Sequence, residues 1–125
     1  MKKILLISML LCSTMTFAQE TFVRKYISMI GTLNFVKGEI EPADATVVFN
    51  PEGLRKIVFY FGKGTTQTYY QIGGVTEGET NSGDKYQVIE CLDERGNSTF
   101  LQLFDEVGCL RVIIKEGYKV EFYTY

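Results

Sequence analysis

The sequence predicts an all-β protein, a single small domain in which seven or eight antiparallel strands follow one another as an up-and-down meander. Three observations predict this class. Runs rich in Val, Ile, Phe and Tyr recur at short intervals, glycine-ended turn sequences separate them, and apolar and polar residues alternate within several runs. The sheet is expected to curl or to close into a small barrel, because closure removes the free edges that invite aggregation.

The first residues, MKKILLISMLLCSTMTFAQE, are typical of a bacterial secretory signal peptide. Two lysines precede an apolar run shorter than the ~20 residues that a membrane-spanning helix needs, and Ala18 ends a small-residue cleavage motif. We expect residues 1–18 to be removed, leaving residues 19–125 as one domain with no transmembrane segment. The protein is then periplasmic or secreted. Lipidation at Cys12 is disfavoured, because Leu11 stands where such signals carry a small residue.

The expected elements follow the order in which turns divide the chain. Residues 20–33 combine helical spacing of apolar residues with many β-branched residues, so a strand is favoured and a short helix is the alternative. Residues 34–44 are expected to form a loop, and residues 73–83 (GGVTEGETNSG) a long flexible connection. The remaining strands are expected at 45–50, 54–61, 65–72, 84–92, 98–104, 109–115 and 118–124.

Three stretches, 50–53, 93–96 and 105–108, share one piece of turn chemistry. Each begins with Asn or Asp, which caps a type I turn, and ends with a glycine that supplies a positive φ. This pattern predicts three-residue hairpin loops with a bulge, and the loop length sets the register of the strands. Residues 115–117 offer a fourth tight turn, which would pair Ile114 with Tyr118. Even-numbered residues from 86 to 122 should then share one face, taken as the core face: Tyr86, Val88, Glu90, Leu92, Phe100, Gln102, Phe104, Leu110, Val112, Ile114, Tyr118, Val120 and Phe122.

The opposite, odd-numbered face is expected to be largely polar. Arg111 falls opposite Glu121 on this face, which is a favourable cross-strand pair. Cys91 and Cys109 lie near opposite ends of the strand at 98–104, ~20 Å apart at ~3.3 Å per residue. A disulfide needs Cα atoms within roughly 7 Å. No intramolecular disulfide is therefore expected, although an exported protein could form one.

Several chemistries are disfavoured by composition. The chain has no histidine, which removes the usual general base and the commonest metal ligand. Two separated cysteines do not make a zinc site, and no phosphate-binding glycine motif is present. The formal net charge is −2, and no basic patch offers the phosphate neutralisation that nucleic acids require. We therefore expect no catalytic residue, no cofactor, no metal and no nucleic-acid partner.

The candidate ligand site lies on the predicted core face. Glu90 and Gln102 are polar positions among apolar ones, and a buried charge needs a partner. They could orient a small hydrophobic or amphipathic ligand held by aromatic residues of the same face, namely Tyr86, Phe100, Phe104, Tyr118 and Phe122. Alternatively, Gln102 and a tyrosine hydroxyl satisfy Glu90, or the end of the strand curls into solvent and leaves Glu90 near water. The meander resembles lipocalin barrels in architecture alone, and an eight-stranded barrel can hold one small ligand or fill itself with side chains.

A second function is an alternative to ligand binding. On the odd face, Ile89, Leu101 and Ile113 form an apolar stripe, which could contact a partner protein if no part of the chain covers it. Tyrosines also recur through the strands, and tyrosine suits recognition surfaces because it combines apolar area with one polar tip. The alternative is thus a protein-interaction or cell-envelope accessory module. The free volume inside the barrel decides between the two functions.

Overall fold

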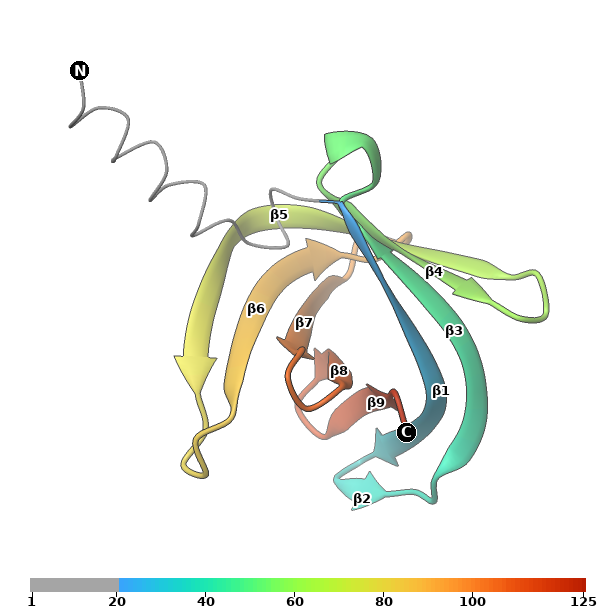
Figure 1. The fold of residues 1–125 in the computed structure, drawn as a ribbon, viewed down its shortest axis with the longest axis vertical. Helices are drawn as coiled ribbons and strands as arrows, with labels where there is room; N and C mark the ends of the chain where they lie inside the picture. The colour runs from blue at the N-terminus through green and yellow to red at the C-terminus, as the bar shows by residue number, and fades with distance from the viewer. Residues whose placement is uncertain (1–20) are drawn as a thin grey trace.

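A computed structural model of the chain describes residues 21–125, so the expected signal peptide at residues 1–18 lies outside the described residues. The described residues form an antiparallel sheet and one short 3-10 turn at Pro51–Gly53 (Figure 1). The strands are β1 (Phe22–Leu33), β2 (Val36–Lys37), β3 (Glu41–Phe49), β4 (Lys56–Phe61), β5 (Thr66–Glu79), β6 (Lys85–Leu92), β7 (Ser98–Phe104), β8 (Cys109–Lys115) and β9 (Tyr118–Tyr123).

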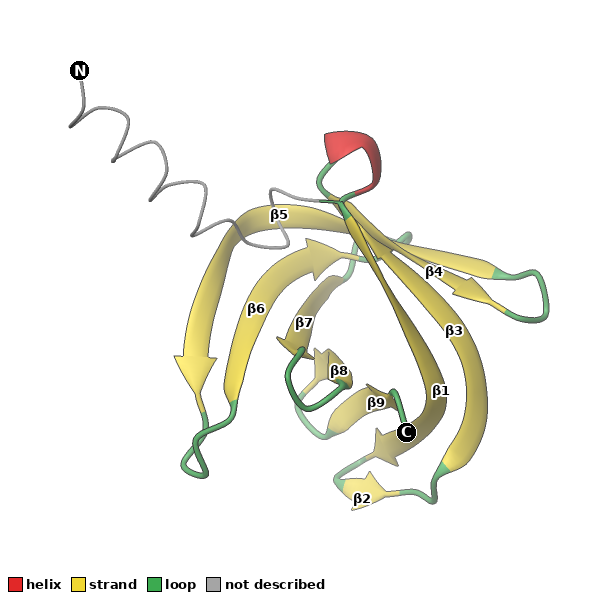
Figure 2. Ribbon diagram, in the orientation of Figure 1, coloured by secondary structure: helices red, strands yellow, loops and turns green. Residues whose placement is uncertain are grey.

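The sheet closes on itself as an eight-stranded barrel. Its strand order is β2-β1-β3-β4-β5-β6-β7-β8-β9, and β1 also pairs with β9, from Ser28 opposite Tyr123 to Thr32 opposite Lys119. The short β2 pairs only with the end of β1 and adds one strand outside the barrel. Figure 2 shows strands on all sides of the enclosed space and almost no helix. The predicted all-β, antiparallel fold is confirmed.

Two segments differ from the expected elements. Residues 22–33 form a strand, as favoured, but β3 begins at Glu41, inside the predicted loop. The predicted connection at 73–83 is also wrong, because β5 runs on to Glu79 and pairs with β6 along this stretch. An irregularity in register between Gln71 and Val75 contains Gly73 and Gly74, and glycines are tolerated within strands at such bulges.

Of the three hairpin registers predicted between residues 86 and 122, two are confirmed, apart from the last turn, where Lys115 and not Ile114 lies opposite Tyr118. Glu90 lies opposite Phe100, and Val112 lies opposite Val120. The register between β7 and β8 is wrong by one residue, because Phe104 rather than Asp105 lies opposite Cys109. The loop at 105–108 therefore contains four residues where the sequence predicts three. The three-residue loop predicted at 50–53 is also wrong, because the Asn50 N–H donates to the Lys56 carbonyl oxygen and the loop extends to Arg55.

This single difference reverses which face of β6 and β7 points inward. In these two strands the odd-numbered residues face the interior: Leu101 is fully buried, whereas Phe100 is 42% exposed. In β8 and β9 the even-numbered residues Leu110, Val112 and Phe122 are buried, as predicted. Ile114, also predicted on the core face, is instead 50% exposed, because the register shifts between Ile113 and Lys115. The predicted stripe is thereby divided, because Ile89 and Leu101 belong to the core while Ile113 lies opposite Phe100 on the outer wall.

The barrel interior is filled with side chains. Phe59 lies near its centre, with ring centroids 5.4 Å from Tyr69 and 5.5 Å from Phe122. A small barrel of this strand number has an interior just wide enough for side chains to fill. The buried core consists of Tyr26, Ala45, Val47, Phe49, Ile57, Phe59, Tyr69, Ile89, Cys91, Leu101, Leu103, Leu110, Val112 and Phe122.

The β6–β7 turn has the predicted hairpin geometry. The Asp93 carboxylate caps the turn, since its Oδ1 accepts the backbone N–H groups of Arg95 at 2.9 Å and Asn97 at 2.8 Å. These hydrogen bonds hold the pKa of Asp93 below its ordinary value. Gly96 has φ of 83°, a left-handed conformation that disfavours any side chain with a Cβ atom.

Replacing Gly96 by alanine is expected to lower the free energy of unfolding by about 1–2 kcal/mol, the usual cost of a left-handed residue with a side chain. A Cβ atom at Gly96 would meet nothing within 4 Å, so the cost is conformational and not steric. Gly31→Ala is the matched control, because its Cβ also meets nothing and its φ is ordinary. Urea denaturation should show a loss only for Gly96→Ala, and equal midpoints would contradict the turn geometry.

Candidate functional site

A groove of about 410 Å³ lies on the outer wall, over β6 to β9. Aromatic side chains from three strands and from the C-terminus line it. Tyr86 and Phe104 lie with ring centroids 5.2 Å apart, and Tyr123 and Tyr125 lie 5.4 Å apart. Strand pairing brings them together, because Phe104 and Tyr123 each lie opposite the same residue, Cys109.

A glycine makes room for one of these rings. Gly78 lies opposite Tyr86 in the β5–β6 ladder, and a Cβ atom on Gly78 would lie only 2.4 Å from the Tyr86 ring. The tyrosine ring therefore packs against Gly78 at the edge of the groove, in the space that a Cβ atom would fill. A side chain at position 78 would force this ring to move.

The floor of the groove carries a charged network. Glu121 is only 5% exposed although it points outward from β9. Its Oε2 accepts hydrogen bonds from Arg111 Nε at 3.3 Å, Arg111 Nη2 at 3.1 Å and the Tyr123 hydroxyl at 3.1 Å. Arg111 Nη1 donates to Gln102 Oε1 at 3.0 Å. The predicted Arg111–Glu121 pair is confirmed, and the network fixes its members in place.

Cations flank the Glu121 carboxylate on more than one side. Lys119 Nζ lies 3.9 Å from Glu121 Oε1, and the Arg111 guanidinium lies 5.3 Å from the centroid of the Phe104 ring, a cation–π distance. The groove therefore combines a neutralised carboxylate with apolar rings. It can accept hydrogen bonds at Gln102 and the tyrosine hydroxyls while excluding water with the rings.

The structure brings together three of the six predicted site residues. Tyr86, Gln102 and Phe104 line the groove. They share a face, as the correctly predicted β6–β7 register requires, but that face is the outer wall and not the interior. Glu90 and Phe100 lie elsewhere on the same wall.

The remaining predicted residues have their own surroundings. Glu90 Oε2 accepts a hydrogen bond from Ser98 Oγ at 3.4 Å and is not enclosed by an apolar pocket. Tyr118 lies at the β8–β9 turn, where Lys115 Nζ is 4.4 Å from its ring centroid. Phe122 faces the core.

Sequence reasoning missed Arg111, Glu121 and Tyr123 as parts of the candidate site. The expected cross-strand pair of Arg111 with Glu121 was the available signal. The pair was predicted on the odd-numbered face, which in β8 and β9 is indeed the outer wall, but Glu121 is buried there and not solvated. What the sequence did not show is that the aromatic residues of β6 and β7 share this face.

Cys91 and Cys109, the two cysteines within residues 21–125, lie on opposite faces of the sheet, and both are free thiols. Cys91 is in the core, where burial raises the pKa of its thiol to about 12. Cys109 is on the outer wall beneath the groove, and burial raises its thiol pKa as well. Neither thiol is ionised at neutral pH, and it is the thiolate that acts as nucleophile or metal ligand.

Among residues 21–125, no helix is long and apolar enough to cross a membrane. No group of three or more His, Cys, Asp or Glu side chains in the same range is arranged to hold a metal ion.

Alkaline pH is expected to unfold the barrel from about pH 10 upward. Burial raises the pKa of Tyr69 to about 12 and raises the pKa values of Tyr26 and Tyr123 as well. The folded state therefore favours the protonated phenols. Their contribution to stability is complete below the pKa of tyrosine in the unfolded chain, near 10, and is lost as the pH rises through the higher pKa values of the folded state. Absorbance at 295 nm should show some tyrosines ionising only together with the loss of the near-ultraviolet circular dichroism. Ionisation of all eight tyrosines in the still-folded protein would contradict this.

Comparison with known proteins gave no matching family model, no matching curated protein and no matching solved structure.

Proposed function

We propose that this chain is an exported, non-enzymatic binding module that engages a partner protein through the groove on its outer wall. One observation carries the proposal: the residues suited to recognition line the outside of the barrel, while the inside is filled by its own core. The signal-like N-terminal sequence supports export. The absence of histidine and the protonated thiols support a role other than catalysis.

The composition of the groove suits contact with a protein. Tyrosine and arginine are enriched at protein interfaces, and tyrosine offers a large, rigid contact area with one hydrogen-bonding tip. Tyr125 is 68% exposed and Val107 is 43% exposed at the rim. A partner that covered these two side chains would bury apolar area around a charged network that is already neutralised.

Site-specific photocrosslinking in the host tests this proposal. A photoreactive phenylalanine analogue in place of Tyr125 should yield a covalent adduct with one protein of defined mass. The same analogue in place of Tyr60, a 47% exposed tyrosine on β4, is the matched control and should not yield that adduct. The same adducts from both positions, or none from position 125, would contradict the proposal.

A small amphipathic ligand is the second candidate occupant of the groove. The groove's volume of about 410 Å³ falls within the ~300–1,000 Å³ of small-molecule sites, and Tyr86, Gln102 and Phe104 were predicted as ligand contacts. Native mass spectrometry of protein purified from its host should then show an added mass of a few hundred daltons that the Tyr86→Ala variant loses. An added mass retained by that variant would argue against this occupant.

A further inference from the structure

The second half of β5 is an unpaired strand edge. β5 has only β4 and β6 as neighbours in the sheet, and β4 pairs with β5 no further than Lys56 opposite Tyr70. Beyond this point the Gln71 N–H donates to the Arg55 carbonyl oxygen, and Arg55 Nη2 donates to the Gly73 carbonyl oxygen. From residue 75 to 79 β5 pairs with β6 alone. No described strand covers its other edge.

The backbone groups that face this free edge can be identified. The Thr80 N–H donates to the Asp84 carbonyl oxygen at 2.9 Å, which directs the backbone of Thr80 toward β6. Alternation along an antiparallel strand then directs Thr76 and Gly78 toward β6 as well. Val75, Glu77 and Glu79 therefore direct their N–H and C=O groups away from the sheet, where an added strand could bond to them.

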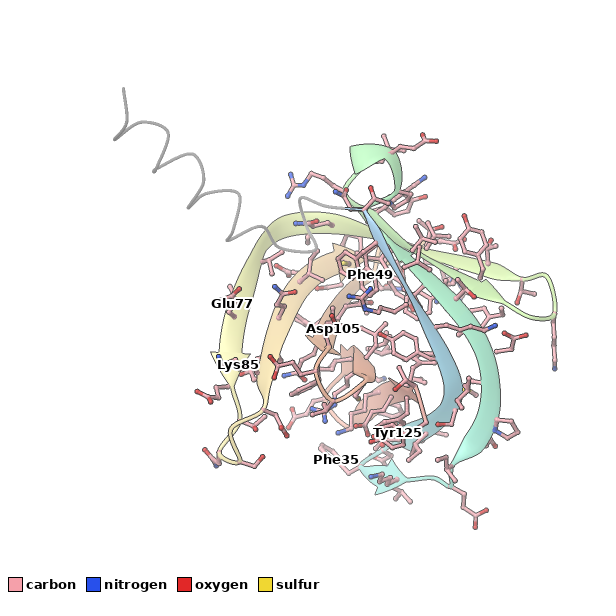
Figure 3. The ribbon with its side chains drawn as sticks, in the orientation of Figure 1. Phe35, Phe49, Glu77, Lys85, Asp105 and Tyr125 are labelled. Carbon is pink, nitrogen blue, oxygen red and sulfur yellow. The ribbon has the colours of Figure 1, made fainter. Side chains whose placement is uncertain are left out.

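The side chains along this edge are acidic and face a cleft. Glu77 and Glu79, with Lys85 and Gln87 of β6, line one side of a cleft of about 600 Å³. Asp105 and Glu106 of the β7–β8 loop line its other side. Figure 3 labels Glu77 and Lys85 on the β5–β6 hairpin and Asp105 on the loop. The core residue Leu103 also lines the cleft, which places it on the inner face of the hairpin, and Tyr86 lies at the edge of both this cleft and the groove.

The carboxylates of the cleft are incompletely neutralised. Asp105 is held by Arg24, with Nε to Oδ1 at 2.7 Å and Nη2 to Oδ2 at 2.8 Å. Glu77, Glu79 and Glu106 form no ion pair with a described residue, and among the described residues that line the cleft only Lys85 is basic. An incoming strand thus meets unpaired backbone groups beside excess negative charge.

The geometry points to an extended, lysine- or arginine-containing segment of a partner polypeptide, added antiparallel to the free edge of β5. Main-chain hydrogen bonds from Val75, Glu77 and Glu79 would supply affinity, and the glutamates would select basic side chains at alternate positions, as in β-strand addition. A second copy of β5 is a poor occupant. Self-pairing would bring glutamates of the two copies close together, and like charges across a ladder are destabilising.

The test uses the chain as purified from its host and a short peptide in which lysine alternates with threonine, acetylated and amidated at its ends. Nuclear magnetic resonance titration should shift the amide resonances of Val75, Glu77 and Glu79, and hydrogen exchange at these amides should slow. Glu77→Gln and Glu79→Gln should each weaken binding by about two- to fivefold, the effect of removing an exposed ion pair. A matched peptide with glutamate in place of lysine should bind more weakly.

Methylated peptides separate strand addition from charge attraction alone. A lysine opposite Glu77 would direct its own N–H toward β5, so N-methylation of the lysines should abolish binding. N-methylation of the threonines, which face away, should leave it intact. Equal binding of both methylated peptides, no binding of the lysine peptide at millimolar concentration, or protection of the same amides by dimerisation alone would overturn the inference. None of these outcomes would contradict the proposed function of the outer-wall groove, because Tyr125 and Val107 take no part in the test.

Discussion

Leu101→Ala is expected to lower the free energy of unfolding by about 2–5 kcal/mol, the range for truncating a buried leucine. Leu101 is fully buried in the barrel core. The loss combines transfer of the leucine atoms to water with the cavity that they leave, because the surrounding core relaxes only in part. Chemical denaturation followed by circular dichroism measures this difference directly.

Phe100→Ala is the matched control, one residue away in the same strand. Phe100 is 42% exposed on the outer wall, so its truncation should cost about 1 kcal/mol or less, even though more atoms are removed. The reverse ranking, with Phe100→Ala the more damaging change, would show that even-numbered residues of β7 face the core. In that case the loop at 105–108 would have the three residues that the sequence predicts.

Arg111→Met is expected to cost about 2–3 kcal/mol, because it leaves the nearly buried Glu121 carboxylate without its main cationic partner. Methionine retains much of the arginine stem that packs near Phe104 but removes the guanidinium that contacts both Glu121 and Gln102. The cost lies somewhat below the usual range for a fully buried ion pair, since the Arg111 side chain is 29% exposed. Thermal or urea denaturation near neutral pH provides the measurement.

The double variant Arg111→Met with Glu121→Gln identifies the cause of this loss. Glutamine keeps the size and hydrogen-bonding oxygen of Glu121 but not its charge, so the second substitution should recover most of the stability in the Arg111→Met background. In the wild-type background Glu121→Gln should itself be destabilising. Strictly additive effects of the two substitutions would mean that the pair is not coupled, contrary to the network described here.

Local turn chemistry predicted the β6–β7 hairpin correctly but misjudged the β7–β8 loop, although both begin with Asp and end with Gly. The difference lies in what each aspartate binds. The Asp93 carboxylate caps its own turn through the N–H groups of Arg95 and Asn97. The Asp105 carboxylate instead binds Arg24, far away in the sequence. The Asp105 carboxylate thus faces Arg24, and the loop that begins with it contains one more residue than the sequence predicts.

The candidate site was predicted only in part for the same reason. Tyr86, Gln102 and Phe104 were grouped correctly because the β6–β7 register is local. Their grouping with Arg111, Glu121 and Tyr123 depends on the β7–β8 register. The predicted register was wrong by one residue, so it placed these three residues on the opposite face of the sheet. Likewise, Gly73 and Gly74 indicated a loop, but β6 pairs with β5 along the following residues and extends it as a strand.

Composition, strand periodicity and glycine turns are local properties, and they sufficed to establish an all-β antiparallel meander, most strand positions and two hairpin registers. Which face of β6 and β7 points inward was decided by contacts between distant parts of the chain. Side chains alternate along a strand with a period of two, so one additional loop residue moves a whole strand's side chains to the other face. The longer β7–β8 loop begins at Asp105, and the ion pair of Asp105 with Arg24 forms only once the barrel has brought β1 beside this loop.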